Sequence, residues 1–565
     1  MTDRNRRRIK RTVIALLLPA AIGTLVAIWF NLRTAVQPPE IKEALITSGQ
    51  PENPEPGFFR MGNNWLKLSR TGLWEMYLEG GPFERGAAGG KLARPLIAAQ
   101  EHAFTGFIRE LIPSAFYLRF LKYFIYWFNR DLDQYISEEY RKEIYGFSLS
   151  AAEAYSYIGT GYRRMLNYHS AHDVGHALQD YSLVGCTSFG VWGSDSEDGS
   201  LIVGRNFDFY AGDEFARNKI VCFEKPDSGH AFMMVTWAGM IGVVSGMNEK
   251  GLTVTINAAK SAIPSSARTP VSLVAREILQ YAGNIGEAYA IASKRETFVS
   301  ESFFIGSAAD RQAAIIEKSP WKTVLVRTGR DRIICANHFQ SREFSTDPLN
   351  ILNKRENASV YRAMRLEQDI EAHAPMDYRD VASVLRDRKG WNGQEIGMGN
   401  EKAVNQLIAH HSVIFMPEKL LAWVSTSPWQ IGPYVCYNLS EIFHNFAGLP
   451  QKVEITAADR EITSDPFFRS PDYLQFMRFR EMRRELTQSL RTGKMDLKDS
   501  FFEEFRASNP EYYEVYSLTG DYYAMSGRTT EAETAYRRAL SKTVPRWTEK
   551  EKIIGKLAGL LTKEK

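Results

Sequence analysis

Residues 184–193 read Val-Gly-Cys-Thr-Ser-Phe-Gly-Val-Trp-Gly, and the rest of the chain is organised around this stretch. Cys186 stands between a glycine and a small hydroxylated residue, at the head of a β-prone run. A second apolar run, at 201–203, follows an Asp-Gly pair at 198–199. An Asp-Gly turn between two such runs predicts a β-hairpin.

The predicted hairpin gathers reactive groups around the cysteine. Its second run leads into Gly-Arg-Asn-Phe-Asp at 204–208, so strand pairing would bring Arg205 and Asp208 towards Cys186. A nearby cation lowers the pKa of a thiol, and a carboxylate can orient the base that serves it. Cys186 is therefore a candidate nucleophile; the alternative is a buried cysteine that behaves as a small hydrophobic residue.

The composition is that of an ordinary globular protein. With 565 residues, the chain can hold a large core and more than one domain. The net charge is +4 and 44% of the residues are hydrophobic, without the basic bias of nucleic-acid-binding proteins. The cysteines, at 186, 222, 335 and 436, lack the spacing typical of zinc sites. We therefore expect no disulfide framework, no zinc site and no nucleic-acid partner.

The N-terminal segment has the pattern of a membrane anchor. Arginine and lysine crowd residues 4–11, and the following residues 12–30 carry no charge. That length would span the hydrocarbon core of a bilayer, which is about 30 Å thick. Residues 31–36 offer no clear signal-peptidase site, so we expect an uncleaved anchor with a cytoplasmic basic flank. The prediction is a single-pass protein of the inner membrane with a periplasmic catalytic domain; a twin-arginine export signal and a buried apolar helix are the alternatives.

Composition and periodicity divide the rest of the chain. We expect a linker rich in Pro and Glu at 37–57 after the anchor at 1–36, a mostly helical front segment at 58–185, a strand-rich part at 186–460 and a helical extension at 465–565. Strands are predicted at 219–225, 231–237, 240–245, 252–257, 302–306, 312–317 and 322–327, a hairpin at 412–425, and helices at 269–283, 357–372 and 378–388. Runs of strands with segregated helices indicate an α+β architecture.

One stretch of the front segment is unusually aromatic. Residues 115–128 are dense in Phe, Tyr and Trp, interrupted by Arg119 and Lys122. This stretch is too short to span a bilayer. It is either a helix packed in the core or an interfacial helix on a membrane surface.

The C-terminal extension contains a repeat-like pattern. The small and aromatic residues of 518–545 follow the spacing of one tetratricopeptide (TPR) unit. A single unit cannot bury its own face, because such repeats normally stack. It either packs on the rest of the chain or offers a docking surface to a protein partner.

Several histidines come just before the cysteine. His172 and His176 are four residues apart, so on a helix they would share a face and could hold a metal. No further ligand with matching spacing accompanies them, and we expect no metal. We expect these residues and His169 to have a structural role, or a part in processing at Gly185.

Four motifs in order resemble one enzyme family. They are Gly-Cys-Thr-Ser-Phe at 185–189, Gly-Arg-Asn-Phe-Asp at 204–208, Gly-Met-Asn-Glu-Lys-Gly-Leu-Thr-Val at 246–254 and Ala-Asn-His-Phe at 336–339. Together they resemble the N-terminal nucleophile (Ntn) hydrolases with a cysteine nucleophile. The match is to peptidase family C45, the acyl-CoA:6-aminopenicillanic acid acyltransferase-like group, with choloylglycine hydrolases and acid ceramidase as relatives. It covers about residues 58–445.

The resemblance implies a fold and a maturation step. It implies a four-layer αββα sandwich for the catalytic domain at 186–460, with 58–185 as a propeptide-like or α-subunit-like segment. It also implies self-cleavage between Gly185 and Cys186, which would give Cys186 a free α-amine. Such an amine has a pKa of about 8, so it can take the proton of the thiol without a catalytic histidine. No cofactor and no metal are needed.

The resemblance also implies residue roles. Asp208 corresponds to the carboxylate that orients the α-amine, and Arg205 to the cation beside the thiolate. Asn257 and Asn337 correspond to the two oxyanion-hole positions. Arg362 corresponds to a supporting arginine, with Arg365 as its competitor.

The combined expectation is a membrane-anchored, self-processing cysteine amidohydrolase or acyltransferase. It would form a Cys186 thioester from a linear, non-peptide amide, either a small molecule or a lipid. The alternative is an inactive scaffold that acts through its TPR-like helices, and a Cys/His protease using His338 is a third, weaker interpretation. The long front segment departs from simple relatives that begin almost at their cysteine, which leaves the cleavage itself to be tested.

Overall fold

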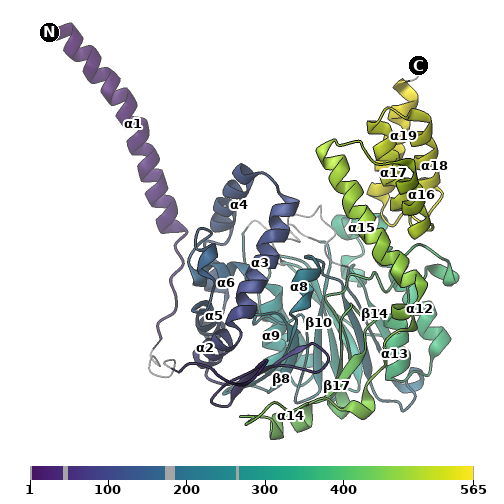
Figure 1. Ribbon diagram of the computed structural model, residues 1–565. Coiled ribbons are helices and arrows are strands. Elements are labelled where there is room, and N and C mark those ends of the chain that lie inside the picture. The colour runs from purple at the N-terminus through teal and green to yellow at the C-terminus, as the bar shows by residue number, and fades with distance from the viewer. Residues whose placement is uncertain (1–2, 42–48, 172, 174–184, 262–265, 564–565) are drawn as a thin grey trace.

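A computed structural model describes residues 3–41, 49–171, 173, 185–261 and 266–563 (Figure 1). Its centre is a pair of stacked sheets. The larger sheet runs in the order β1 (Glu52–Glu55), β2 (Phe58–Met61), β3 (Asn64–Leu68), β4 (Trp74–Gly80), β7 (Ile220–Pro226), β8 (Phe232–Thr236), β9 (Ser245–Asn248), β10 (Leu252–Ala258), β11 (Glu301–Ser307), β12 (Gln312–Lys318) and β13 (Thr323–Val326). The β4 and β7 strands pair in parallel, so the front segment is built into the same sheet as the later strands.

The smaller sheet carries the predicted hairpin. Its order is β14 (Arg332–Cys335), β5 (Thr187–Val191), β6 (Ile202–Phe207), β15 (His411–Met416), β16 (Leu421–Ser425) and β17 (Tyr434–Asn438). The antiparallel β5–β6 pair places Ser188 opposite Arg205, and β15–β16 forms the second predicted hairpin. The Asp-Gly pair at 198–199 lies in the connection between β5 and β6, where Gly199 has a φ of +74°.

Helices cover the outer faces of both sheets. On the side of the larger sheet they are α2 (Pro82–Leu92), α3 (Arg94–Leu111), α4 (Ala115–Phe128), α5 (Glu138–Ser148), α6 (Gly161–His169), α8 (Asp213–Arg217), α9 (Val271–Tyr281) and α10 (Ile285–Lys294). On the side of the smaller sheet they are α11 (Pro348–Glu356), α12 (Ser359–His373) and α13 (Tyr378–Leu385), while α14 (Leu439–Asn445) follows β17. Leu366 and Val381 from this second group pack against Phe189 and Trp423 of the smaller sheet.

A dry core joins the two sheets. Val203 and Phe415 of the smaller sheet pack with Phe223 and Phe304 of the larger one, and all four are fully buried. Apolar side chains on alternate strand positions face this interior. The two sheets therefore pack against one another through this core.

The C-terminal extension is helical. It comprises α15 (Pro471–Thr492), α16 (Asp499–Ser508), α17 (Tyr513–Met525), α18 (Thr529–Leu540) and α19 (Trp547–Lys563) (Figure 1). Its aromatic core also includes Leu407, Trp429 and Ile431 from the preceding part of the chain. The extension contacts the loop before β15, since Asn400 donates to the Thr543 carbonyl at 2.9 Å and the Met398 amide donates to Asn509 at 3.0 Å. Arg480 also forms an ion pair with Asp213 of α8 at 2.7 Å.

The N-terminal prediction needs a correction. Residues 12–30 do lie in a helix, α1 (Asp3–Arg33), which extends away from the body of the molecule (Figure 1). A helix must be both long and apolar to cross a bilayer. In the part of the chain that the structure describes, no helix meets both conditions. The transmembrane helix included in the predicted fold class is therefore wrong, and so is the single-pass inner-membrane localisation with a periplasmic domain.

The aromatic helix α4 is not packed in the core. Phe116 is 84% exposed, and Tyr126 is the buried residue of this helix. Near its end, Trp127 contacts Trp29 of α1 with ring centroids 5.5 Å apart. Arg33 of α1 forms an ion pair with Asp131 just beyond α4 at 2.8 Å. The junction between α1 and the body is thus aromatic and ionic.

One predicted strand is misplaced. The apolar run at 240–245 forms a strand only from Ser245, where β9 begins. The residues before it lie under α9, and the Val243 amide donates to the Ser272 carbonyl at 2.9 Å. These residues are apolar because they are buried against a helix, and the alternation that identifies a strand is absent.

Candidate active site

Cys186 lies immediately before β5, at the end of the smaller sheet. Its side chain is 1% exposed. Arg205, from the neighbouring strand β6, donates through Nη2 to the Cys186 Sγ at 3.6 Å and to the Ile256 carbonyl at 2.6 Å. The guanidinium also lies over the Phe207 ring, 4.3 Å from its centroid. Arg205 is therefore held in place on several sides, with one donor aimed at the sulfur.

Burial dominates the ionisation of the thiol. It raises the pKa of Cys186 to about 12, although Arg205 and Arg362 act in the opposite direction. The negative charges of Asp208 and Glu301 raise the pKa further. In the uncut chain the sulfur is thus a neutral thiol, so any attack requires a group that accepts its proton.

Asp208 follows β6 and is fully buried. Its Oδ2 accepts a hydrogen bond from Gln406 Nε2 at 3.2 Å, whereas Oδ1 has no hydrogen-bond partner among the described residues. Burial raises the pKa of Asp208 to about 7, against the opposing charges of Arg362 and Arg205. A buried carboxylate oxygen without a donor is costly, so this atom is placed to receive one.

Arg362, at the start of α12, connects the cysteine with Asn337. It donates to the Cys186 carbonyl at 3.3 Å and to Thr187 Oγ1 at 3.0 Å, and its Nη2 also donates to Asn337 Oδ1. The competitor Arg365 instead pairs with Asp369 and Asp387, at 2.8 and 2.9 Å. Of the two arginines, the structure brings Arg362 to the cysteine.

This difference gives a paired prediction. We expect Arg362→Ala to lower turnover about 100-fold. Arg362 holds Cys186 and Asn337 in position, and a displacement of a reacting group by about 1 Å can lower the rate by about that factor. Arg365→Ala should leave turnover within a few-fold, although it removes two partly buried ion pairs. Steady-state kinetics on both variants, with thermal unfolding to confirm the fold, make the comparison. Equal losses in the two variants would contradict this assignment.

The two asparagines are fixed by hydrogen bonds. Asn257 in β10 accepts from Ser188 Oγ at 2.8 Å and donates to the Cys335 carbonyl at 3.0 Å. Asn337 donates to the Ala258 carbonyl at 3.1 Å, and its side-chain oxygen accepts a hydrogen bond from Arg362. An amide nitrogen carries two hydrogens, so each asparagine keeps one beyond these bonds.

Several residues of the site have no motif in the sequence. Gln406, in the loop before β15, donates to both the Gly185 carbonyl and Asp208. Ser245 and His411 support Arg205: the Arg205 guanidinium donates to Ser245 Oγ, and Ser245 Oγ lies 2.8 Å from His411 Nε2. Glu301 is buried, and neither of its carboxylate oxygens has a partner among the described residues. Each comes from a distant part of the chain, so no local spacing signals it.

An apolar pocket begins one residue beyond Asp208. Its walls include Phe209, Phe215, Trp237 and Met240. The Phe209 and Trp237 rings are stacked with centroids 6.2 Å apart. The lining also includes Gln100 and Glu101, while the aromatic walls suit an apolar group.

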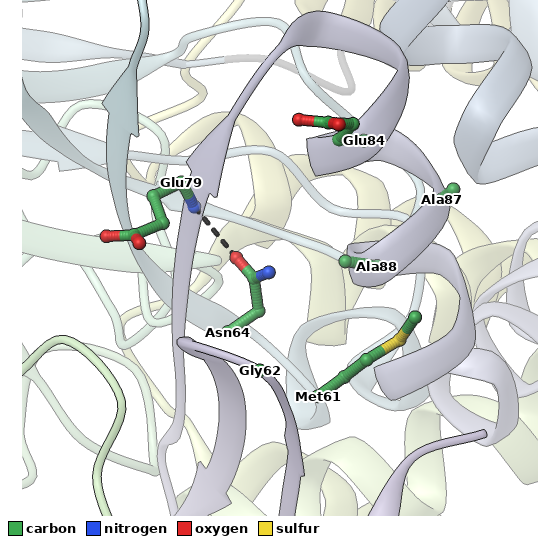
Figure 2. Close-up of a pocket in the computed structure, with 7 residues that line it drawn as sticks. All are labelled: Met61, Gly62, Asn64, Glu79, Glu84, Ala87 and Ala88. Carbon is green, nitrogen blue, oxygen red and sulfur yellow. Dashed lines mark hydrogen bonds between the residues drawn. The ribbon is translucent and has the colours of Figure 1, made fainter. Parts of the chain in front are cut away.

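A second hollow lies elsewhere, between β2–β4 and α2. Figure 2 shows its lining, in which Asn64 accepts a hydrogen bond from the Glu79 backbone amide at 2.8 Å. Its volume is about 270 Å³, and Met61, Glu84 and Ala88 are among the residues that line it. None of the predicted site residues is part of this lining, so it does not belong to the cysteine site.

His169 and His338 are both buried, and each has a hydrogen-bond partner. His169 is fully buried; its Nδ1 lies 2.7 Å from the Met165 carbonyl and its Nε2 accepts from the Ile241 amide at 3.0 Å. Burial lowers its pKa to about 4. His338 lies 2.8 Å from Ser359 Oγ and also has a pKa lowered to about 4 by burial. His172 and His176 lie outside the described residues, among which no cluster suited to a metal ion occurs.

Comparison with known proteins gives a family for part of the chain. Residues 194–425, less than half of the chain, match the model of the acyl-coenzyme A:6-aminopenicillanic acid acyl-transferase family. The match begins after Cys186 and includes Arg205, Asp208, Asn257 and Asn337. An uncharacterized protein of Archaeoglobus fulgidus is 24% identical over 274 residues, which is 44% of this chain and 44% of that protein.

Solved structures show weaker likenesses. An N-acylethanolamine-hydrolyzing acid amidase ortholog of Caenorhabditis elegans is 17% identical, covers 41% of this chain and 93% of its own, and has a TM-score of 0.30. A mutant of the conjugated bile acid hydrolase of Clostridium perfringens is 12% identical, covers 48% of this chain and 98% of its own, and has a TM-score of 0.32. Penicillin V acylase of Agrobacterium tumefaciens is 14% identical, covers 43% of this chain and 83% of its own, and has a TM-score of 0.29. The match over residues 194–425 confirms the resemblance to the acyl-coenzyme A:6-aminopenicillanic acid acyl-transferase family that the four motifs predicted.

Proposed function

We propose that this protein is a thiol amidohydrolase or acyltransferase that acts on a small-molecule amide through Cys186. The observation that carries the proposal is the contact of the buried Cys186 thiol with the Arg205 guanidinium, beside the Asp208 carboxylate, of which one oxygen has no hydrogen-bond partner among the described residues. The apolar pocket beyond Asp208 supports an amide with an apolar acyl group.

The proposed chemistry begins with removal of the residues before Cys186. Cleavage of the Gly185–Cys186 bond gives Cys186 an α-amine, and Asp208 Oδ1 is the acceptor available to orient it. The neutral amine takes the proton of the thiol, and the sulfur attacks the amide carbonyl of the substrate. Asn257 and Asn337 donate their remaining hydrogens to the oxyanion. The proton then passes to the leaving amine, and a thioester remains.

The thioester is resolved in a second half-reaction. Water or an acceptor amine attacks the thioester carbonyl and gives up a proton to the α-amine, and the sulfur leaves and regains its proton. With water the enzyme is an amidohydrolase; with an amine it is an acyltransferase. The residues needed are the same in both cases, so the acceptor is decided by what the pocket admits.

Trapping the thioester tests the proposal. The full chain is incubated with small N-acyl amides of aryl and aliphatic acyl groups, quenched in acid, digested and mapped by mass spectrometry. We expect a hydroxylamine-sensitive acyl group on Cys186 and none on Cys222, Cys335 or Cys436, which are buried thiols in the same chain and serve as internal controls. Absence of any adduct and of turnover would favour an inactive scaffold instead.

A further inference from the structure

The carbonyl of the bond to be cut has a specific partner. Gln406 Nε2 donates to the Gly185 oxygen at 3.1 Å and to Asp208 Oδ2 at 3.2 Å. The glutamine is 2% exposed. One amide nitrogen therefore contacts both the carbonyl of the junction and the carboxylate beside the thiol, and it uses both of its hydrogens for this.

The loop that carries Gln406 is fixed by its neighbours. The Asn405 amide donates to the Asp387 carbonyl at 2.7 Å, and the Leu407 amide donates to Asn405 Oδ1 at 2.9 Å. Leu407 has a φ of +54°, a conformation that costs free energy and persists when the surroundings hold it. The position of the amide is thus set by the fold.

The junction requires glycine for this contact. A Cβ on residue 185 would lie 2.6 Å from Gln406 Nε2 and 3.0 Å from its Oε1. A side chain there would push the amide away from the carbonyl, and glycine avoids this because it has no Cβ. The glycine and the glutamine therefore form one arrangement.

We propose that Gln406 is the oxyanion donor for cleavage of the chain at Gly185–Cys186. This inference rests on the proposed function, because it concerns the maturation of the same site. The sulfur of Cys186 attacks the Gly185 carbonyl carbon, and the developing negative charge falls on the oxygen that Gln406 contacts. Asp208 accepts the thiol proton and returns it to the Cys186 nitrogen as the C–N bond breaks. Water then hydrolyses the thioester, releasing the Gly185 carboxylate and the free thiol.

The donor for self-cleavage differs from the donors proposed for substrate. Asn257 and Asn337 donate to other backbone carbonyls, and within the described structure neither donates to the Gly185 oxygen. Gln406 is the side chain that contacts this oxygen in the described structure. The chain thus uses one amide to mature and two others to turn over, so the two activities can be separated by mutation.

Cleavage kinetics test this separation. Full-length Gln406→Ala is synthesised in a cell-free system, and the processed fraction is followed by intact-mass measurement. We expect cleavage to slow about 100-fold, the usual effect of losing one oxyanion donor. Gln430→Ala is the matched control, because Gln430 is also a fully buried glutamine but its side chain makes no hydrogen bond to any described residue. It should be cut at the wild-type rate.

Two further variants distinguish chemistry from folding. Asn337→Ala should be cut at the normal rate and then show low turnover, the reverse of Gln406→Ala. Gln406→Glu has nearly the same shape but loses both N–H donors when ionised. Relative to wild type at the same pH, its cleavage should therefore be slow at pH 8 and recover partly at low pH, where a protonated carboxyl can donate; the comparison with wild type removes the effect of protonating Asp208 itself. A merely structural glutamine would not produce this pH dependence. Thermal unfolding verifies that each variant is folded.

The outcomes separate the two proposals. If wild type is cut and Gln406→Ala is cut equally fast, Gln406 is not the donor, while the proposed function stands. If wild type remains uncut, the inference on Gln406 is overturned. If it also forms no acyl adduct at Cys186, the proposed function fails as well.

Discussion

Cys186→Ala will leave the full-length chain uncut and without turnover. The expected loss in turnover is about 10⁶-fold, the size seen when a covalent nucleophile is removed. The physical reason is that the Cys186 sulfur is the nucleophile in both reactions, cleavage of its own chain and attack on the substrate. Intact-mass analysis should give two fragments for wild type, one beginning at Cys186, and a single species for the variant.

The control for this prediction is another buried cysteine. Cys436→Ala removes a thiol from β17, where burial also raises the pKa to about 12. It should be cut and active, apart from the stability lost with a small core side chain. Cys186→Ser tests the chemistry more finely. A hydroxyl is less acidic than a thiol, so the Cys186→Ser chain should be cut far more slowly than wild type. Two fragments from Cys186→Ala would show that another group or another protease makes the cut.

The part of the site that follows from local sequence was predictable. The Asp-Gly turn and the two β-prone runs predicted the pairing of β5 with β6, which places Arg205 beside Cys186. Strand pairing across a short connection depends on nearby residues, so the sequence carries enough information for it. The choice between Arg362 and Arg365 could not be made from the sequence, because it depends on how α12 lies against the smaller sheet.

The rest of the site depends on contacts between distant segments. Gln406 reaches the junction from the loop before β15, and His411 reaches Arg205 through Ser245. No periodicity or spacing links these positions, since they meet only after both sheets have stacked.

The anchor prediction was wrong for a different reason. It treated an uncharged run as sufficient for a membrane span, and no helix of the described chain is both long enough and apolar enough to cross a bilayer.

Asp208→Asn will stabilise the uncut protein while it slows its cleavage. Burial raises the pKa of Asp208 to about 7, from an ordinary value near 4. Between about pH 4 and pH 7 the folded chain therefore holds a proton that the unfolded chain has released, so stability falls as the pH rises through this window. Above pH 7 the full cost of the buried charge is present, on the order of 4 kcal/mol.

The measurement compares Cys186→Ala with Cys186→Ala/Asp208→Asn, so that both chains stay uncut. At pH 8 the double variant should be more stable by up to about 4 kcal/mol, and near pH 4 the difference should disappear. In the background with an intact cysteine, Asp208→Asn should slow cleavage by about 10²-fold to 10⁴-fold, the usual contribution of a general base. A free energy of unfolding with no pH-dependent difference would contradict the raised pKa.

Asp369 provides the matched control for this last prediction. Its pKa is also raised to about 7, mainly by burial, and its Oδ2 has no hydrogen-bond partner among the described residues. It pairs with Arg365, away from Cys186. Asp369→Asn should therefore change stability with pH in the same direction, yet leave cleavage at its normal rate. If both substitutions slowed cleavage equally, the effect would come from the fold, and Asp208 would have no special part in moving the proton of Cys186.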